Sequence, residues 1–179
     1  MIIYLIRHAS AGQRVLNPKK DEKRPLDADG IEQCGHVGRA LAAMNVQPDM
    51  IISSPFKRAT QTASLIGNEI GYEGKLQLEP AMLPEASFAD FRRMLEKYAK
   101  YDAIMVVGHN PSITDFLGRI LTKSGAAALA DFKKGAVACT EIERQAASLK
   151  WFFTPKMARS IQAAAAAAAE KSHPKTSRK

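Results

Sequence analysis

The sequence has few cysteines and no long apolar run. Cys34 and Cys139 lie far apart, and neither belongs to a Cys-x-x-Cys pair, so a zinc knuckle or a redox motif is not expected. No uninterrupted apolar stretch approaches the ~20 residues of a membrane-spanning helix, and no basic segment precedes an apolar one at the N-terminus, as in a secretory signal. We therefore expect a cytoplasmic protein with two reduced thiols and no membrane partner.

Acidic residues are outnumbered, but the excess of positive charge is local. The formal net charge is +8, and residues 150–179 alone hold seven Lys or Arg against one acid, which is +6 and leaves +2 for the rest. Beyond residue 154 no aromatic side chains alternate with the basic ones, so we expect no nucleic-acid partner. Seven consecutive alanines, residues 163–169, predict a helix of marginal stability, and the last residues, 172–179, are expected to be disordered. We therefore divide the chain into a domain, residues 1–154, and a basic, Ala-rich tail, residues 155–179.

The rest of the chain has the composition of an ordinary globular domain, with 46% apolar and 25% charged residues over 179 positions. Apolar runs at residues 2–6, 50–52 and 103–107 predict buried strands, and they alternate with helical patterns at 30–44, 56–70 and 87–98. Residues 136–142 and 148–153 predict a closing hairpin. This order predicts an α/β fold, a three-layer α/β/α sandwich whose mostly parallel central sheet has antiparallel edge strands.

Polar residues follow the three strongest strands. The first ends in Arg7 and His8, the second leads into Ser54 with Arg58 one helical turn later, and the third ends at His109. We interpret Ser54 as the cap of the following helix and Asp27 as the cap of an earlier one, and residues 10–25 as a long solvated loop. Arg7 and His8 alone are compatible with purely structural roles. If the three strands are neighbours, however, their carboxyl ends meet in one crevice.

Such a crevice has the chemistry of a phosphate pocket. Two guanidinium groups, two imidazoles and two helix N-termini all favour an anion. A metal site is the obvious alternative, but no carboxylate or cysteine is adjacent to either histidine to complete a ligand set, and the arginines would repel a dication. A neutral imidazole is a usable nucleophile near pH 7 when an acceptor fixes its tautomer. His8 is therefore a candidate nucleophile, with Arg7, Arg58 and His109 binding the phosphoryl oxygens.

Four sequence blocks resemble the histidine phosphatase (phosphoglycerate-mutase-like) superfamily in order and spacing, over roughly residues 1–153. They are Leu5-Ile6-Arg7-His8-Ala9, Arg24-Pro25-Leu26 with Gly30, Ser53-Ser54-Pro55 with Arg58-Ala59 and Gln61-Thr62, and Val107-Gly108-His109-Asn110-Pro111. Within the superfamily, the short chain looks like the SixA-type phosphohistidine phosphatases. The resemblance implies a cytoplasmic, cofactor-free phosphatase in which His8 is phosphorylated and Arg7, Arg58 and His109 bind phosphate.

Arg24, Ser54 and Asn110 are candidates for further contacts with the substrate. The carboxylic acid that protonates the leaving oxygen in larger members of the superfamily has no clear counterpart here, and Glu85 is the nearest candidate. An alcohol leaving group needs such an acid, whereas imidazole leaves readily once it is protonated. The sequence therefore favours phosphohistidine on a protein, in some cases a histidine phosphotransfer domain, as the substrate. Two alternatives remain open: a phosphatase of small phosphomonoesters and a non-catalytic phosphate-binding module.

Overall fold

The computed structural model describes residues 1–122, 130–143 and 146–172. The strands are β1 (Ile2–Arg7), β2 (Met50–Ser53), β3 (Gln77–Leu78), β4 (Ala103–Gly108), β5 (Val137–Glu143) and β6 (Ala146–Phe153). The helices are α1 (Pro18–Glu22), α2 (Ala28–Ala43), α3 (Lys57–Glu69), α4 (Phe88–Lys97), α5 (Ser112–Leu121) and α6 (Pro155–Ser172), with one turn of 3-10 helix, η1 (Pro80–Met82).

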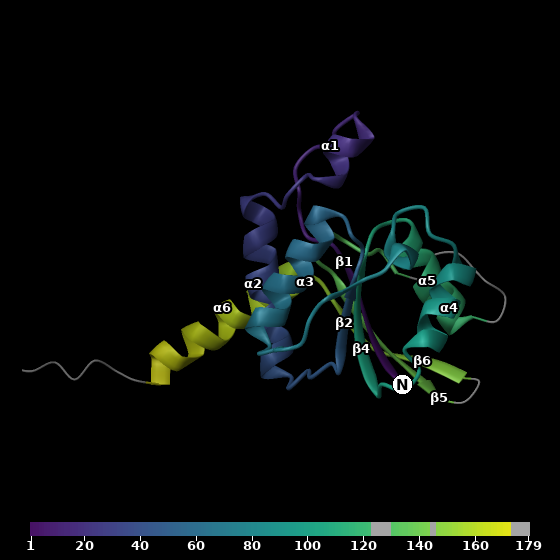
Figure 1. Cartoon of the computed structure of the whole chain (residues 1–179). Coiled ribbons are helices and arrows are strands. Elements are labelled where there is room, and N and C mark those ends of the chain that lie inside the picture. The colour runs from purple at the N-terminus through teal and green to yellow at the C-terminus, as the bar shows by residue number, and fades with distance from the viewer. Residues whose placement is uncertain (123–129, 144–145, 173–179) are drawn as a thin grey trace, which may run out of the picture.

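One six-stranded sheet organises the fold, in the order β3-β2-β4-β1-β5-β6. The first four strands of that order are parallel, and β5 and β6 continue the sheet in antiparallel pairing. Helices α2, α3 and α6 lie on one side of the sheet and α4 and α5 on the other (Figure 1). The predicted three-layer sandwich with antiparallel strands at one edge is confirmed.

Strand β1 shows why the apolar runs are unbroken. Ile3 and Leu5 pack into the cluster that contains the side chains of α4 and α5, whereas Tyr4 and Ile6 pack into the cluster on the side of α2 and α3. A strand buried on both faces needs apolar residues at every position instead of at alternate ones. The same holds for β4, all of whose residues are buried. The first polar side chains therefore appear only where these strands end.

Two segments differ from the sequence interpretation. Residues 10–25 are not only a loop, because α1 forms within them; Asn17 caps it by accepting the Lys20 N–H at 3.3 Å, and Pro18 suits its first position. Asp21 of this helix is buried, so the segment is tied to the body of the protein. The helix predicted after residue 55 begins at Lys57, and Phe56 is its N-cap without a side-chain bond, so the interpretation of Ser54 as the cap is wrong.

The start of α6 packs against α2. Ala158 is buried, and Gln162 donates to the backbone oxygen of His36 on α2 at 2.9 Å. The alanines beyond Gln162 are exposed, as expected of a helix without an apolar face. Most of the segment 172–179, for which we predict disorder, lies outside the described residues. No helix among the described residues is both long and apolar enough to cross a membrane.

Candidate active site

The strand register brings the predicted site residues together. Arg7 pairs with Gly108 and Ser53 with Val107, so the residues that follow β1, β2 and β4 emerge side by side at the carboxyl end of these parallel strands. The backbone N–H of His8 donates to Gly108 O at 2.9 Å, and that of Ser54 donates to Val107 O at 2.9 Å. The predicted convergence of these residues on one site is therefore present.

His8 is buried and neutral. Its Nδ1–H donates to the backbone oxygen of Ala9 at 2.7 Å, which leaves Nε2 unprotonated, and Nε2 accepts from Arg58 Nε–H at 3.3 Å. Burial, opposed by the bond to Ala9 and reinforced by nearby arginines, lowers the pKa of His8 to about 3. Nε2 therefore presents a lone pair inside the site near neutral pH.

His109 lies next to His8, with the two ring centroids 4.9 Å apart. Its Nε2 is 2.8 Å from Ser54 Oγ, and that oxygen accepts the Phe56 N–H at 3.3 Å. When the Ser54 hydroxyl donates its hydrogen to Nε2, His109 carries its proton on Nδ1. Burial, together with the neighbouring His8 and Arg58, lowers the pKa of His109 to about 2. Ser54 thus orients an imidazole instead of capping a helix.

Two buried polar atoms have no hydrogen-bond partner among the described residues: Arg7 Nε and His109 Nδ1. Arg7 Nη1 donates to the backbone oxygen of Phe132 at 2.6 Å, which fixes the guanidinium at the end of β1. Unpartnered N–H donors in a buried position are costly, and a bound group with several acceptor oxygens would remove that cost. Both donors belong to residues predicted to bind phosphate.

Arg58 is held by Asp21, a residue that sequence reasoning missed. Arg58, 4% exposed, donates from Nη1 to the backbone oxygen of Asp21 at 2.8 Å and approaches its Oδ2 at 3.2 Å, while Arg24 Nε donates to Oδ1 at 2.8 Å. Burial alone would raise the pKa of Asp21, but hydrogen bonds from Arg24 and Val15 and the charge of Arg58 outweigh it, so this pKa is lowered. An acid three residues before Arg24 in a basic segment was the available signal.

The remaining candidates lie at different distances from this centre. Asn110 Nδ2 donates to Phe132 O at 3.3 Å, so Asn110 and Arg7 share one acceptor, and Phe132 is a second contributor that the sequence did not reveal. Arg24 reaches the site through Asp21. Burial lowers the pKa of Arg7 and Arg58, opposed by the charges of Asp131 and Asp21 respectively, and an arginine keeps its charge through such a shift.

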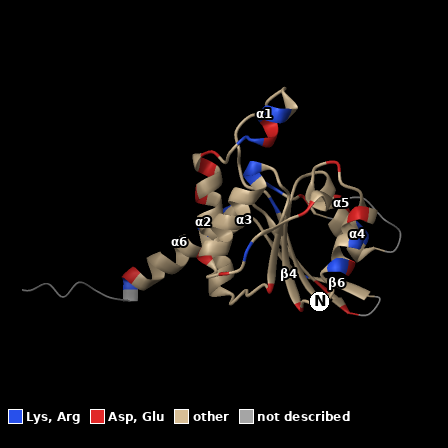
Figure 2. Ribbon diagram, in the orientation of Figure 1, with Lys and Arg blue, Asp and Glu red and all other residues tan. Residues whose placement is uncertain are grey.

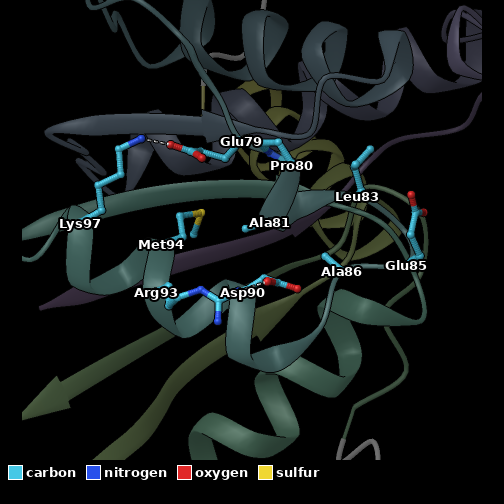
Figure 3. A pocket seen from close by; sticks show the side chains of 10 residues that line it. All are labelled: Glu79, Pro80, Ala81, Leu83, Glu85, Ala86, Asp90, Arg93, Met94 and Lys97. Atoms are coloured by element: carbon cyan, nitrogen blue, oxygen red, sulfur yellow. Dashed lines mark hydrogen bonds and ion pairs between the residues drawn. The ribbon is translucent and has the colours of Figure 1, made fainter.

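Glu85 is not part of the hydrogen-bond network that surrounds the two histidines among the described residues. Its exposed side chain lines a hollow of about 520 Å³ between the segment after β3 and helix α4, at the opposite end from the ion pair of Lys97 with Glu79 (Figure 3). No hydrogen bond or ion pair joins Glu85 to the histidines within the described part of the chain. Its role as an acid stays a prediction. The described residues also contain no cluster of His, Cys, Asp or Glu that could hold a metal ion.

An α/β sandwich whose strand ends present two neutral histidines among arginines has the construction of a histidine phosphatase. The family model of the histidine phosphatase superfamily (branch 1) matches residues 3–97, more than half of the chain, and the chain belongs to this superfamily. An uncharacterised protein of Picosynechococcus is 30% identical over 119 residues, 65% of this chain and 70% of its own length. The phosphohistidine phosphatase SixA of Escherichia coli is 23% identical over 63% of this chain and 70% of its own length.

A solved structure of the protein histidine phosphatase SixA in complex with tungstate has the same fold. It superposes with a TM-score of 0.77 at 19% identity, covering 88% of this chain and 99% of that one. Membership of the superfamily supports a phosphatase, as predicted from the four sequence blocks.

Proposed function

We propose that the protein removes the phosphoryl group from phosphohistidine on another protein, through a phosphohistidine intermediate on His8. The observation that carries this proposal is the pairing of an unprotonated His8 Nε2 with buried donors that lack partners, Arg7 Nε and His109 Nδ1. The first group attacks phosphorus, and the other two bind phosphoryl oxygens. Tungstate in the SixA structure is a tetrahedral oxyanion, which agrees with a site for phosphate.

In the first step, a bond forms between His8 Nε2 and phosphorus while the phosphorus–nitrogen bond of the substrate breaks. The electron pair goes to the substrate imidazole, which leaves neutral because its other nitrogen carries a proton. Arg58 moves its donor from His8 Nε2 to a phosphoryl oxygen, and the Ala9 carbonyl keeps the Nδ1 proton of the now cationic His8 in place. Charge on the equatorial oxygens is stabilised by Arg7, Arg58 and His109.

In the second step, water attacks phosphorus and the bond to His8 Nε2 breaks. The electron pair returns to Nε2, the water proton leaves with phosphate or solvent, and neutral His8 is restored. Its low folded-state pKa makes the free imidazole the stable product of this step. Arg24 and Asn110, at the edges of the site, are proposed to contact the substrate around the phosphoryl group.

The leaving group argues for phosphohistidine over phosphate esters. An alcohol would need a positioned acid, a contribution of roughly 10² to 10⁴. Asp21 is held ionised by Arg24 and Arg58, and no hydrogen bond or ion pair joins Glu85 to the histidines within the described residues. An imidazole that is already protonated leaves without such help. The similarity to SixA, a phosphohistidine phosphatase, points to the same substrate class.

A substrate panel tests the proposal. A phosphorylated histidine phosphotransfer domain and free phosphohistidine should be hydrolysed with kcat/KM values well above those for sugar phosphates and nucleotides. A radiolabelled phosphoenzyme should form in the wild type and in the control His36→Asn, but not in His8→Asn. Faster turnover of the esters would make the protein a phosphomonoesterase. No turnover and no phosphoenzyme would leave a phosphate-binding module.

A further inference from the structure

Residues 12–25, which we name the arm, project beyond the carboxyl end of the parallel strands, where the candidate site lies. In Figure 1, α1 stands away from the other helices at the end toward which β1 points. The arm contains the most exposed large apolar side chain among the described residues, Leu16, at 98% exposed. An isolated exposed leucine needs no explanation, but this one is surrounded by a particular set of charges.

The arm carries several exposed cations. Arg14, Lys19, Lys20 and Lys23 are all exposed, and no ion pair joins any of them to a carboxylate within the described residues. Figure 2 shows basic residues on the arm at this end of the molecule. Glu22 is its one exposed acid. An apolar side chain among unpaired cations matches a partner surface that is acidic around an apolar depression.

The arm is fixed to the candidate site, so a partner bound to it would be at a defined distance from His8. Asp21 links the two regions: its carboxylate accepts from Val15 N–H and Arg24 within the arm, and it pairs with Arg58, whose Nε contacts His8. Arg24 also donates from Nη1 to the backbone oxygens of Ala11 and Gly12, which holds the base of the arm. Binding energy from the arm can therefore be used to position the phosphoryl group.

We propose that the arm is the docking surface for the phosphoprotein, with Leu16 entering an apolar depression and the surrounding cations contacting acidic side chains near the phosphorylated histidine. This inference rests on the proposed phosphohistidine phosphatase function and adds the chemistry of its partner. A nucleic acid fits less well, because the arm has no aromatic side chain on which a base could stack. A membrane fits less well, because one leucine supplies only about 2 kcal/mol of burial.

Two arm variants test the proposal, Leu16→Ala and the double reversal Lys19→Glu/Lys20→Glu. The matched control is Lys75→Glu/Lys100→Glu. These two exposed lysines precede the parallel strands β3 and β4 and so lie at the amino end of the strands, opposite the candidate site. With a phosphorylated histidine phosphotransfer domain, kcat/KM should fall about tenfold for each arm variant at low salt. With free phosphohistidine, it should stay within about twofold, and the control should match the wild type for both probes.

The reversal should also reduce the dependence of kcat/KM on salt for the protein probe, because it removes long-range attraction. Equal losses on both probes, or no loss on the protein probe, would overturn the docking role. If the wild type hydrolyses neither probe, the proposed function fails. The docking role of the arm is then tested by a binding measurement. The phosphorylated domain is titrated onto His8→Asn with and without the arm reversal. Weaker binding with the reversal supports docking, and equal binding overturns it.

The same titration separates the other kinds of partner. Vesicles containing phosphatidylglycerol, or single-stranded RNA, are offered to the wild type and to the arm reversal. Suppose that either one binds the wild type as tightly as the phosphorylated domain does, and that this binding is lost in the arm reversal. The arm then recognises that partner, and the proposed docking of a protein is overturned. Binding of the domain alone supports it.

Discussion

The candidate site and the arm are both rich in cations, but they hold them in opposite ways. Arg58 is buried, and its donors are bonded to Asp21 and His8, whereas Lys19 and Lys20 on the arm are exposed and form no ion pair within the described residues. A guanidinium held in a fixed orientation suits a group of fixed shape, such as phosphate. Free lysines suit a surface whose acids vary in position. Recognition of the phosphoryl group and of its carrier should therefore be separable by mutation.

Arg58→Ala removes a fixed cation of the candidate site and should cause the largest loss of activity. Removing a fixed cation from the phosphoryl oxygens should lower kcat/KM by about 10³-fold on every substrate, large or small. Steady-state hydrolysis of free phosphohistidine and of a phosphorylated domain measures it. Arg92→Ala removes an exposed arginine of α4 that forms an ion pair with Glu96; it is the control and should have no effect. A loss confined to the protein substrate would place Arg58 in carrier recognition instead.

The two buried histidines also predict how stability depends on pH. Burial lowers the pKa of His8 to about 3 and that of His109 to about 2, whereas both would take up a proton near pH 6.5 in the unfolded chain. Below about pH 6.5 the unfolded state therefore binds more protons than the folded state. The free energy of unfolding should then fall as pH decreases, by up to about 1.4 kcal/mol per pH unit for each histidine.

Urea unfolding at a series of pH values measures this dependence. The double variant His8→Gln/His109→Gln should have a shallower slope between about pH 6 and pH 4, and each single variant should give an intermediate slope. The arm reversal Lys19→Glu/Lys20→Glu changes no histidine and should retain the contribution of these two groups. An unchanged slope in the double variant would mean that the histidines are not held neutral by the fold.

Asp21 joins the two regions, and its substitution should affect both. Asp21→Asn keeps the shape of the side chain but removes the charge that holds Arg58 and Arg24. We expect kcat/KM to fall by roughly 10- to 100-fold on small and protein substrates alike, as one charge-assisted contact is lost. Glu73→Gln removes an exposed charge from the segment before β3, outside the arm, and is the control. A loss on the protein substrate alone would show that Asp21 shapes the arm without orienting Arg58.

The parts of the site that could be predicted from sequence are those fixed by the sheet. Unbroken apolar runs identify β1 and β4 as strands buried on both faces, and polar residues at their ends must then lie at one edge. Arg7, His8 and His109 follow from this rule. Their register could not be read from any one strand, because it depends on pairing between segments about a hundred residues apart.

The missed contributors are held by contacts without a local signal. Asp21 meets Arg58 across 37 positions, and Arg7 meets the Phe132 carbonyl across 125. Helix α1 is five residues long, too short to show a helical period, so the basic segment around it had the pattern of a solvated loop. A serine before a proline fits the role of a helix cap as well as it fits a bond to an imidazole, so the partner of Ser54 cannot be read from the sequence.

Ser54→Ala should cause a smaller loss of activity, and it tests how the site sets the tautomer of His109. The hydroxyl donates to Nε2, so its loss frees the ring to place its proton on either nitrogen, and only the Nδ1–H form offers a donor to phosphate. We expect kcat/KM to fall about tenfold for all substrates, with arm-dependent discrimination between protein and free phosphohistidine unchanged. Nitrogen chemical shifts of His109 measure the tautomer directly. Ser54→Thr retains the hydroxyl and should restore both the shifts and the rate, whereas a loss of activity without a change of tautomer would assign Ser54 to direct contact with the substrate.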